Sequence, residues 1–445
     1  MRARRARTVE IDAAYRPPAI RRLVERDAGR ASGLLVRKYQ RMAADPFAFF
    51  RGAGHIFHAD FPTGFDEFPL VWLNGDLHLE NFGTYRGDNR LTYFDLGDFD
   101  EGALGPASRD LMRFLSGLHL AMPLLGQPAT VADRLARAYL AAYANALHEG
   151  KALWLDHRLA SGLIGNLMTN LERRQSCSAW LRSRVEGQYH GPRRDSRRLR
   201  LDVGKFMPVP AEWRGAVERT VERLAKDQER AGQGSWHLLD IAWRVAGLGT
   251  LGLPRFGVLI RVAQGSAGRP ITTEGDLLLL DLKQQPGSAM APYLHLDQPD
   301  FASEADRIVA IENRLQAVSP ALLRAVKISG QSFTLRELQP EADKLDLAKI
   351  LASSGHLESA DLAKAVETMG RLTAWAQLRS AGRQGSAIAD QLIAFAGRKD
   401  WRPDLLRAGR AMAKQTEQLW RNSRDWLSTE SGRLRDAAAL ATMPA

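Results

Sequence analysis

The segment from Ile241 to Lys283 constrains the fold more than any other part of the chain. Ile241 to Val245 predicts a strand, Gly247 to Gly252 is a glycine-rich loop, and Arg255 to Val262 is a second apolar run. A dinucleotide-binding glycine fingerprint opens a helix, whereas Pro254 and the β-branched run after it favour another strand. The sequence therefore predicts two strands that are joined by the glycine loop.

The elements that follow extend this unit. A third strand is predicted from Asp276 to Lys283, then a helix from Ala302 to Val318, then strands from Leu323 to Ile328 and from Ser332 to Leu338. This is the element order of a kinase small lobe, in which the glycine loop covers ATP and a strand lysine contacts its phosphates. The residues expected to bind nucleotide are Gly247, Gly249, Thr250, Gly252 and Lys283.

An acidic residue of the predicted helix is expected to complete the nucleotide site. In kinases, a helix glutamate pairs with the phosphate-binding lysine. Glu312 is the preferred partner of Lys283, and Glu304 is the alternative. Either residue also fits a solvated charge on a helix surface.

A second polar cluster lies far upstream, from Asn74 to Asn81, and a strand-like run ending in Asp95 follows it. Phosphoryl transfer needs a carboxylate near the attacking hydroxyl and hard oxygen ligands for Mg²⁺. Asp76 suits the first role. Asn81 suits the second role, as a ligand of Mg²⁺. The carboxylate ligand beside it is expected to be Asp95, and Asp98 is the alternative. The alternative is a hairpin whose Asp and Asn side chains only cap turns.

The order of these pieces differs from that of ordinary kinases, because the catalytic segment precedes the small lobe. Circular permutation restores the usual order, and it is tolerated where chain termini lie at the surface. We therefore expect an α+β, bilobal, kinase-like fold with a small antiparallel β lobe plus a helix and a mostly helical large lobe. The expected divisions are residues 1–234 (large lobe, with the catalytic loop and metal site at 70–117), 235–340 (small nucleotide-binding lobe) and 341–445 (large lobe, second part).

Several motifs support a family resemblance: Arg41 to Gly52, Gly75 to Gly83, Phe94 to Glu101, Gly105-Pro106 with Arg109-Asp110-Leu111, and Gly247 to Gly252 with Leu282-Lys283. Together they resemble the bacterial family catalogued as domain of unknown function 2252. That family resembles the kinase-like superfamily, and its loop is closest to those of aminoglycoside and choline phosphotransferases, which read Gly-Asp-x-His-x-x-Asn. The resemblance implies a catalytic Asp76, metal ligands Asn81 and Asp95, a phosphate-binding Lys283, and a buried Asp110 that braces the loop.

Composition limits the partners. The formal net charge is +11, and arginines are concentrated between residues 182 and 200. This segment fits a solvated loop, and attraction of an anionic substrate or nucleic acid is the alternative. No membrane partner is expected, because no apolar run is long enough to span a bilayer. The lone Cys177 rules out an internal disulfide and favours a cytoplasmic location.

The leading functional hypothesis is an ATP- and Mg²⁺-dependent phosphotransferase that acts on a hydroxyl of an unidentified small molecule or, as a second choice, a protein. Transfer of AMP on the same fold and a non-catalytic nucleotide-binding module are the alternatives. A phosphotransferase requires Lys283 and Asp95 to face one cleft, about 10 Å apart, so that phosphates and Mg²⁺ fit between them.

Overall fold

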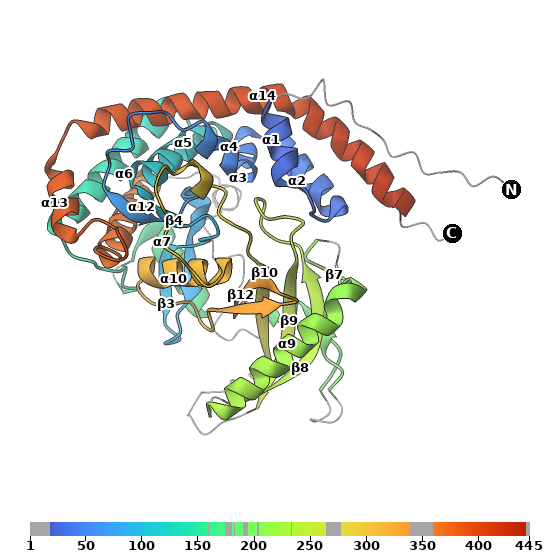
Figure 1. Ribbon diagram of the computed structural model, residues 1–445. Coiled ribbons are helices and arrows are strands. Elements are labelled where there is room, and N and C mark those ends of the chain that lie inside the picture. Colours follow the sequence, from blue (N-terminus) through green and yellow to red (C-terminus); the bar gives the residue numbers. More distant parts are fainter. Residues whose placement is uncertain are drawn as a thin grey trace.

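The structure is a computed structural model, and it describes residues 18–158, 160–173, 180–181, 183–189, 195–202, 204–232, 234–263, 277–338 and 359–441. The protein is α+β, with antiparallel sheets and many helices. Most helices gather on one side of the molecule, and the largest sheet lies on the other side (Figure 1).

The largest sheet of the described residues has the strand order β7-β8-β9-β10-β12-β11, and all neighbouring strands are antiparallel. Runs of Leu, Ile, Val and aromatic residues explain these strands, since such side chains suit a pleated, buried surface. The strands are β7 (Phe206–Met207), β8 (Ser235–Arg244), β9 (Arg255–Ala263), β10 (Leu277–Gln284), β11 (Arg324–Ile328) and β12 (Gln331–Glu337). A separate pair joins β5 (Val185–Glu186) to β6 (Arg198–Leu199).

Two helices accompany this sheet. The Trp213 ring of α9 (Ala211–Arg230) has its centroid 5.6 Å from that of Phe256 and 5.9 Å from that of Phe333. α10 (Glu304–Leu315) contacts β11 and β12. Because β7 and α9 pack with the sheet, this packing unit begins before the division expected at residue 234.

The strands and the helix expected after residue 241 are present, with shifted ends. β8 starts earlier than expected, at Ser235, because its first residues pair with the end of β9. α10 starts later than expected because the side chain of Ser303 accepts a hydrogen bond from the Asp306 N–H and caps the helix.

Two short antiparallel pairs carry the polar cluster that lies upstream. The connection between them is anchored by Leu77, Leu79 and Phe82, whose side chains are fully buried. This apolar anchoring fixes the neighbouring polar residues at the edge of the core. The pairs are β1 (Leu70–Leu73) with β4 (Ala103–Pro106) and β2 (Phe82–Arg86) with β3 (Thr92–Leu96), with the short helix η2 (Leu79–Asn81) before β2.

The largest hydrophobic core lies among α5 (Ser108–Leu124), α6 (Ala129–Glu149) and α12 (Ser359–Arg379). Almost all of α5 is buried, as expected for a helix with neighbours on every side. The long α14 (Trp401–Ala441) runs along the outside and contacts α2 (Ser32–Ala44) and α5 (Figure 1). The other described helices are α1 (Pro18–Arg26), α3 (Pro46–Gly52), α4 (Gly54–Ala59), α7 (Gly162–Arg173), η3 (Ala291–Tyr293) and α13 (Ala389–Gly397).

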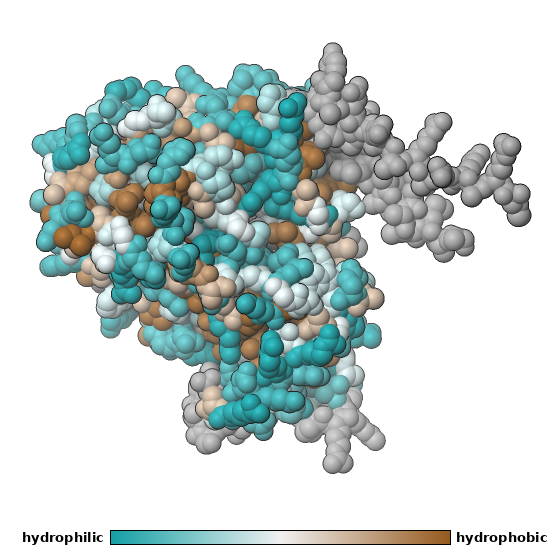
Figure 2. Space-filling model, viewed as in Figure 1, coloured by the Kyte–Doolittle hydropathy of each residue, from teal (hydrophilic) through white to brown (hydrophobic). Residues whose placement is uncertain are grey.

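No helix in the described ranges has both the length and the apolar composition that a bilayer span requires. α14 is long, but its sequence is rich in Arg, Glu and Asp. Hydrophilic residues also predominate on the surface around α9, at the bottom of the view in Figure 2.

The described part of the basic segment 182–200 is a short hairpin with local charge pairs. Arg197 pairs with Asp195, and Arg198 pairs with Glu186 on the opposite strand. These pairs compensate part of the positive charge. Three arginines of the segment lie outside the described residues: Arg182, Arg193 and Arg194.

Candidate active site

The loop from Asn74 to Asn81 is held in place by α5. The carboxylate of Asp110 accepts hydrogen bonds from the backbone N–H groups of Asn74 and Gly75, at 2.8 and 2.9 Å. Gly75 has a φ of +84°, and a Cβ at this position would collide with the backbone carbonyl of Glu101. Asp110 therefore braces a tight backbone bend directly before Asp76.

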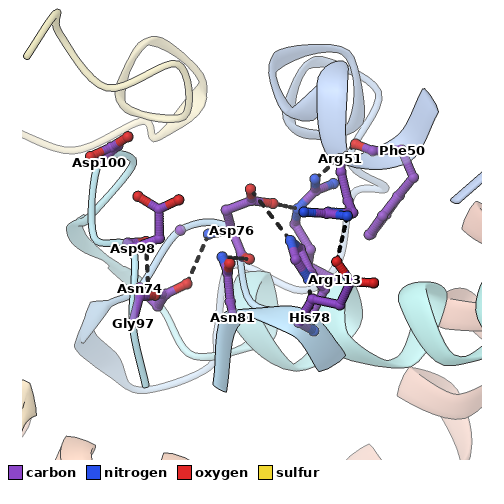
Figure 3. Close-up of polar contacts among 12 residues, drawn as sticks. Phe50, Arg51, Asn74, Asp76, His78, Asn81, Gly97, Asp98, Asp100 and Arg113 are labelled. Atoms are coloured by element: carbon purple, nitrogen blue, oxygen red, sulfur yellow. Dashed lines mark hydrogen bonds and ion pairs between the residues drawn. The ribbon is translucent and has the colours of Figure 1, made fainter. Parts of the chain in front are cut away.

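The carboxylate of Asp76 faces the buried side chain of Arg113 (Figure 3). Arg113 Nε donates to Asp76 Oδ1 at 2.6 Å, and His78 Nε2 lies 3.8 Å from Oδ2. The side-chain amide of Asn81 donates to the backbone carbonyl of Asp76 at 2.7 Å, which brings two expected site residues together. Burial raises the pKa of Asp76, and the charge of Arg113 offsets part of that rise.

Arg113 is a site residue that the sequence analysis did not identify. Its side chain is fully buried, its guanidinium lies 3.8 Å from the ring centroid of Phe50, and its Nη2 donates to the Phe50 carbonyl at 2.9 Å. The signal in the sequence was its spacing from Asp110. Residues three apart lie on the same face of a helix, so both side chains of α5 face the loop.

Lys283, near the end of β10, contacts the segment that follows β3. Its Nζ lies 3.0 Å from Asp98 Oδ1 and also contacts the carboxylate of Asp100. Asp98 has a φ of +55°, a backbone conformation that is uncommon for residues other than glycine and concentrates at functional sites. The structure thus brings the sheet and the segment after β3 into direct contact, and no gap separates Lys283 from these carboxylates.

Asp95, the preferred metal ligand of the sequence analysis, is engaged elsewhere. Its side chain is only 2% exposed, and its Oδ2 lies 3.0 Å from Nη2 of Arg379 at the end of α12. Both of its carboxylate oxygens also accept backbone N–H groups. Of the two carboxylates considered as metal ligands, Asp98 is the one that lies beside Lys283.

Glu312 on α10 is buried, and its nearest ionic partner is Arg336, at 4.0 Å. The expected ion pair between Glu312 and Lys283 is not formed among the described residues, because Lys283 contacts the aspartates after β3. The alternative partner, Glu304, pairs with Arg307 at 2.7 Å. Burial raises the pKa of Glu312 to about 7, although nearby positive charges oppose the rise.

This raised pKa predicts a pH-dependent stability. Between the ordinary Glu value of 4.5 and about 7, the folded carboxyl holds a proton that the unfolded chain releases, so the free energy of unfolding falls as pH rises. The Glu312→Gln substitution removes this loss. Relative to the unmodified protein, it should gain about 3 kcal/mol of stability between pH 5 and pH 8, measured by urea unfolding. A pH-independent difference would contradict the prediction.

The glycine loop is held by hydrogen bonds from the segment between α1 and α2. Arg30, between α1 and α2, donates from Nη1 to the Gly249 carbonyl at 2.7 Å, and the Ala31 N–H donates to the Gly252 carbonyl at 3.0 Å. Gly247 and Gly252 have φ values of +79° and +94°, which favour glycine. The loop conformation therefore depends on these glycines.

A cavity connects the glycine loop with the loop that carries Asp76. Gly249 and Thr250 line it on one side, and Asp76 and Asp100 line it on the other. The structure thus brings together part of the expected nucleotide-binding loop and the expected catalytic residue. Asp98 and Lys283 lie next to this cavity through their contact with Asp100.

The oxygen ligands near Lys283 fit a magnesium ion that binds together with phosphates. Among the described residues, no three His, Cys, Asp or Glu side chains are grouped as a metal site. Mg²⁺ needs only one or two carboxylates when phosphates and water complete its coordination. Asp98 and Asp100 offer carboxylates, and Asn81 does not use its amide oxygen in the bond to Asp76.

Comparison with known proteins identifies the family. The family model described as "Uncharacterized protein conserved in bacteria (DUF2252)" matches residues 30–425, so the chain belongs to this family. No curated protein and no solved structure matches the chain. The family match agrees with the resemblance seen in the sequence motifs.

Proposed function

We propose that this protein is an ATP- and Mg²⁺-dependent phosphotransferase with a kinase-like fold. The observation that carries the proposal is the contact of Lys283 Nζ with Asp98, which joins the end of β10 to the segment after the catalytic loop. Asp76 also shares a cavity with the tip of the glycine loop. A nucleotide site needs these groups at one place, since the phosphates bind between them.

The succession of elements supports the same proposal. β8, β9, β10, α10, β11 and β12 follow one another as strands and helix do in a kinase small lobe, with the lysine on the third strand of this series and a buried glutamate on the helix. The catalytic segment comes earlier in the chain, so the proposed fold is circularly permuted. In this proposal α5, α6 and α12 belong to the large lobe.

In the proposed reaction, the hydroxyl oxygen of the acceptor attacks the γ-phosphorus of ATP. The bond from that phosphorus to the bridging oxygen breaks, ADP leaves, and the hydroxyl proton passes to Asp76. Burial favours this transfer because it raises the pKa of Asp76, and Arg113 orients the carboxylate. Mg²⁺, held by Asp98 and Asn81, would neutralise phosphate charge. Lys283 would exchange its aspartate partners for phosphate oxygens.

Lys283→Ala should remove nucleotide binding. Mg²⁺-ATP at about 100 times its Kd should stabilise the unmodified protein by about 3 kcal/mol, seen as a higher Tm, because ligand binds only the folded state. The variant should show no such rise. The exposed Lys327 on β11 offers a matched control, and Lys327→Ala should keep the shift. A well-folded unmodified protein that Mg²⁺-ATP fails to stabilise would contradict the proposal.

Labelled ATP identifies the group that is transferred. With a phosphotransferase, label from the γ-phosphate appears on the acceptor or, with water in its place, as free phosphate. Label from the α-phosphate on a product would instead indicate AMP transfer. Nucleotide binding without transfer of either label to acceptor pools would favour a non-catalytic module.

A further inference from the structure

The cavity in front of Asp76 is lined by residues from several distant parts of the chain. It lies between the helices α1 to α4 on one side and the catalytic and glycine loops on the other. Gly75, Asp76 and Gly249 are among its lining residues. The cavity therefore opens next to the proposed catalytic carboxylate.

The lining of this cavity carries four basic and three acidic side chains. The charged residues of the lining are Arg26, Arg30, Lys38, Arg51, Asp76, Asp100 and Glu101. Two of these carboxylates, Asp76 and Asp100, already pair with cations outside the lining. Lys38 pairs with Asp27, which is also outside it. Arg30 also pairs with Asp27, and Arg51 pairs with Glu80. Among the described residues, Arg26 is the basic residue of the lining without such an ion pair.

Two of these arginines have donors available for a ligand. Arg26 donates from Nη2 to the Gly287 carbonyl at 2.8 Å, and Arg51 Nη1 lies 2.5 Å from Glu80 Oε2. A guanidinium has five N–H donors, so these contacts leave others unused. Arg51 Nε is buried and has no hydrogen-bond partner within the described part of the chain. Figure 3 shows Arg51 beside Asp76.

His55 on α4 adds an independent sign of a missing ligand. Its side chain lines the cavity and is only 7% exposed. It bonds to the backbone of Arg22, but its Nε2 has no partner among the described residues. Buried polar atoms almost always have a hydrogen-bond partner, because leaving one unsatisfied is costly. A donor from a bound molecule, such as a hydroxyl, would satisfy this nitrogen.

We infer that this cavity is the acceptor subsite and that it binds a small hydroxylated phosphate ester, whose phosphate contacts Arg26 and Arg51 while a hydroxyl faces Asp76. The inference rests on the proposed phosphotransferase function. Arginine suits this role because its planar guanidinium forms paired, charge-assisted hydrogen bonds with phosphate oxygens. Arg51 keeps its ion pair with Glu80, so its unpartnered Nε and the other donors of Arg26 would bind the phosphate oxygens.

Calorimetric titration with inorganic phosphate tests the subsite at constant ionic strength. The unmodified protein should bind phosphate, both alone and with saturating Mg²⁺ and the non-hydrolysable ATP analogue AMP-PNP. Acetate, with a single negative charge, should bind more weakly. Displacement of phosphate by Mg²⁺-AMP-PNP would overturn the inference, because the anion would then occupy the site of the nucleotide phosphates.

Two variants identify the residues that bind the anion. Arg51→Gln and Arg26→Gln should each weaken phosphate binding about tenfold or more, the effect of one lost charge-assisted hydrogen bond. Arg421→Gln, an exposed residue of α14, is the matched control and should bind phosphate as the unmodified protein does. Thermal unfolding checks folding, and Arg26→Gln serves alone if Arg51→Gln does not fold. Unchanged phosphate affinity in folded variants would overturn the inference.

The two proposals can fail separately. Absence of AMP-PNP binding contradicts the proposed phosphotransferase and, with it, the acceptor role of the cavity. Absence of phosphate binding, with AMP-PNP binding intact, contradicts the acceptor inference alone. Binding of both, with dependence on Arg26 and Arg51, supports the inference.

Discussion

Asp76→Asn should lower ATP turnover by about 10²- to 10⁴-fold, the usual contribution of a positioned proton acceptor. The amide cannot take the hydroxyl proton, but its oxygen can still accept the hydrogen bond from Arg113 Nε, which spans 2.6 Å in the unmodified protein. Folding should therefore be largely retained. Turnover is measured with Mg²⁺ and water as acceptor, and circular dichroism monitors the fold.

The choice of asparagine over alanine follows from the burial of Arg113. Removing one partner of a buried ion pair typically costs about 3–5 kcal/mol, because the other charge stays buried without it. Asp76→Ala would therefore confuse loss of activity with loss of stability. Asp425→Asn, a highly exposed position on α14, is the control and should keep full turnover. Normal turnover by folded Asp76→Asn would contradict the catalytic role.

Asp281→Ala should lower the free energy of unfolding by about 3–5 kcal/mol. Asp281 is 1% exposed and lies on β10, two residues before Lys283. Its carboxylate accepts two hydrogen bonds from Arg255, at 2.8 and 2.6 Å, and lies 3.1 Å from Arg244 Nη1. Both arginines are mostly buried, so the variant removes the carboxylate that compensates them. Urea unfolding followed by circular dichroism gives the loss.

A matched substitution on the surface separates the effect of burial on stability from the effect of losing a charge. Asp404 on α14 also pairs with an arginine, Arg407, but both side chains are largely exposed. Asp404→Ala should change stability by less than about 1 kcal/mol, as is usual for surface ion pairs. A loss below about 1 kcal/mol for Asp281→Ala would show that the arginines around β10 do not depend on this carboxylate.

Local sequence patterns predicted most of the sheet. The apolar runs of β9 and β10 identified those strands, and Pro254 excluded a helix after the glycine loop. The ends of the strands were predicted less well, because the start of β8 depends on its pairing with the far end of β9. The packing of β7 and α9 with the sheet likewise depends on tertiary contacts, which no local pattern records.

The candidate site was also predicted only in part, because some of its residues lie close together in the sequence and others meet only through tertiary contacts. Asp76 and Asn81 stood out because of their spacing within one loop, and the structure joins them through a hydrogen bond. The choice between Asp95 and Asp98 needed tertiary information, since Arg379, which engages Asp95, is 284 residues away in the sequence. Lys283 contacts Asp98 and Asp100 directly, whereas the sequence analysis expected a gap for bound phosphates between the lysine and the metal ligand.

The most direct test is a crystal structure with Mn²⁺ and AMP-PNP, in which anomalous scattering locates the metal. The account predicts the triphosphate between Gly249 and Lys283, with the metal coordinated by Asp98 and Asn81 and with Asp76 facing the terminal phosphate. Nucleotide bound elsewhere, or Mn²⁺ and nucleotide absent from the space between Gly249 and Lys283 in crystals soaked to saturation, would contradict it.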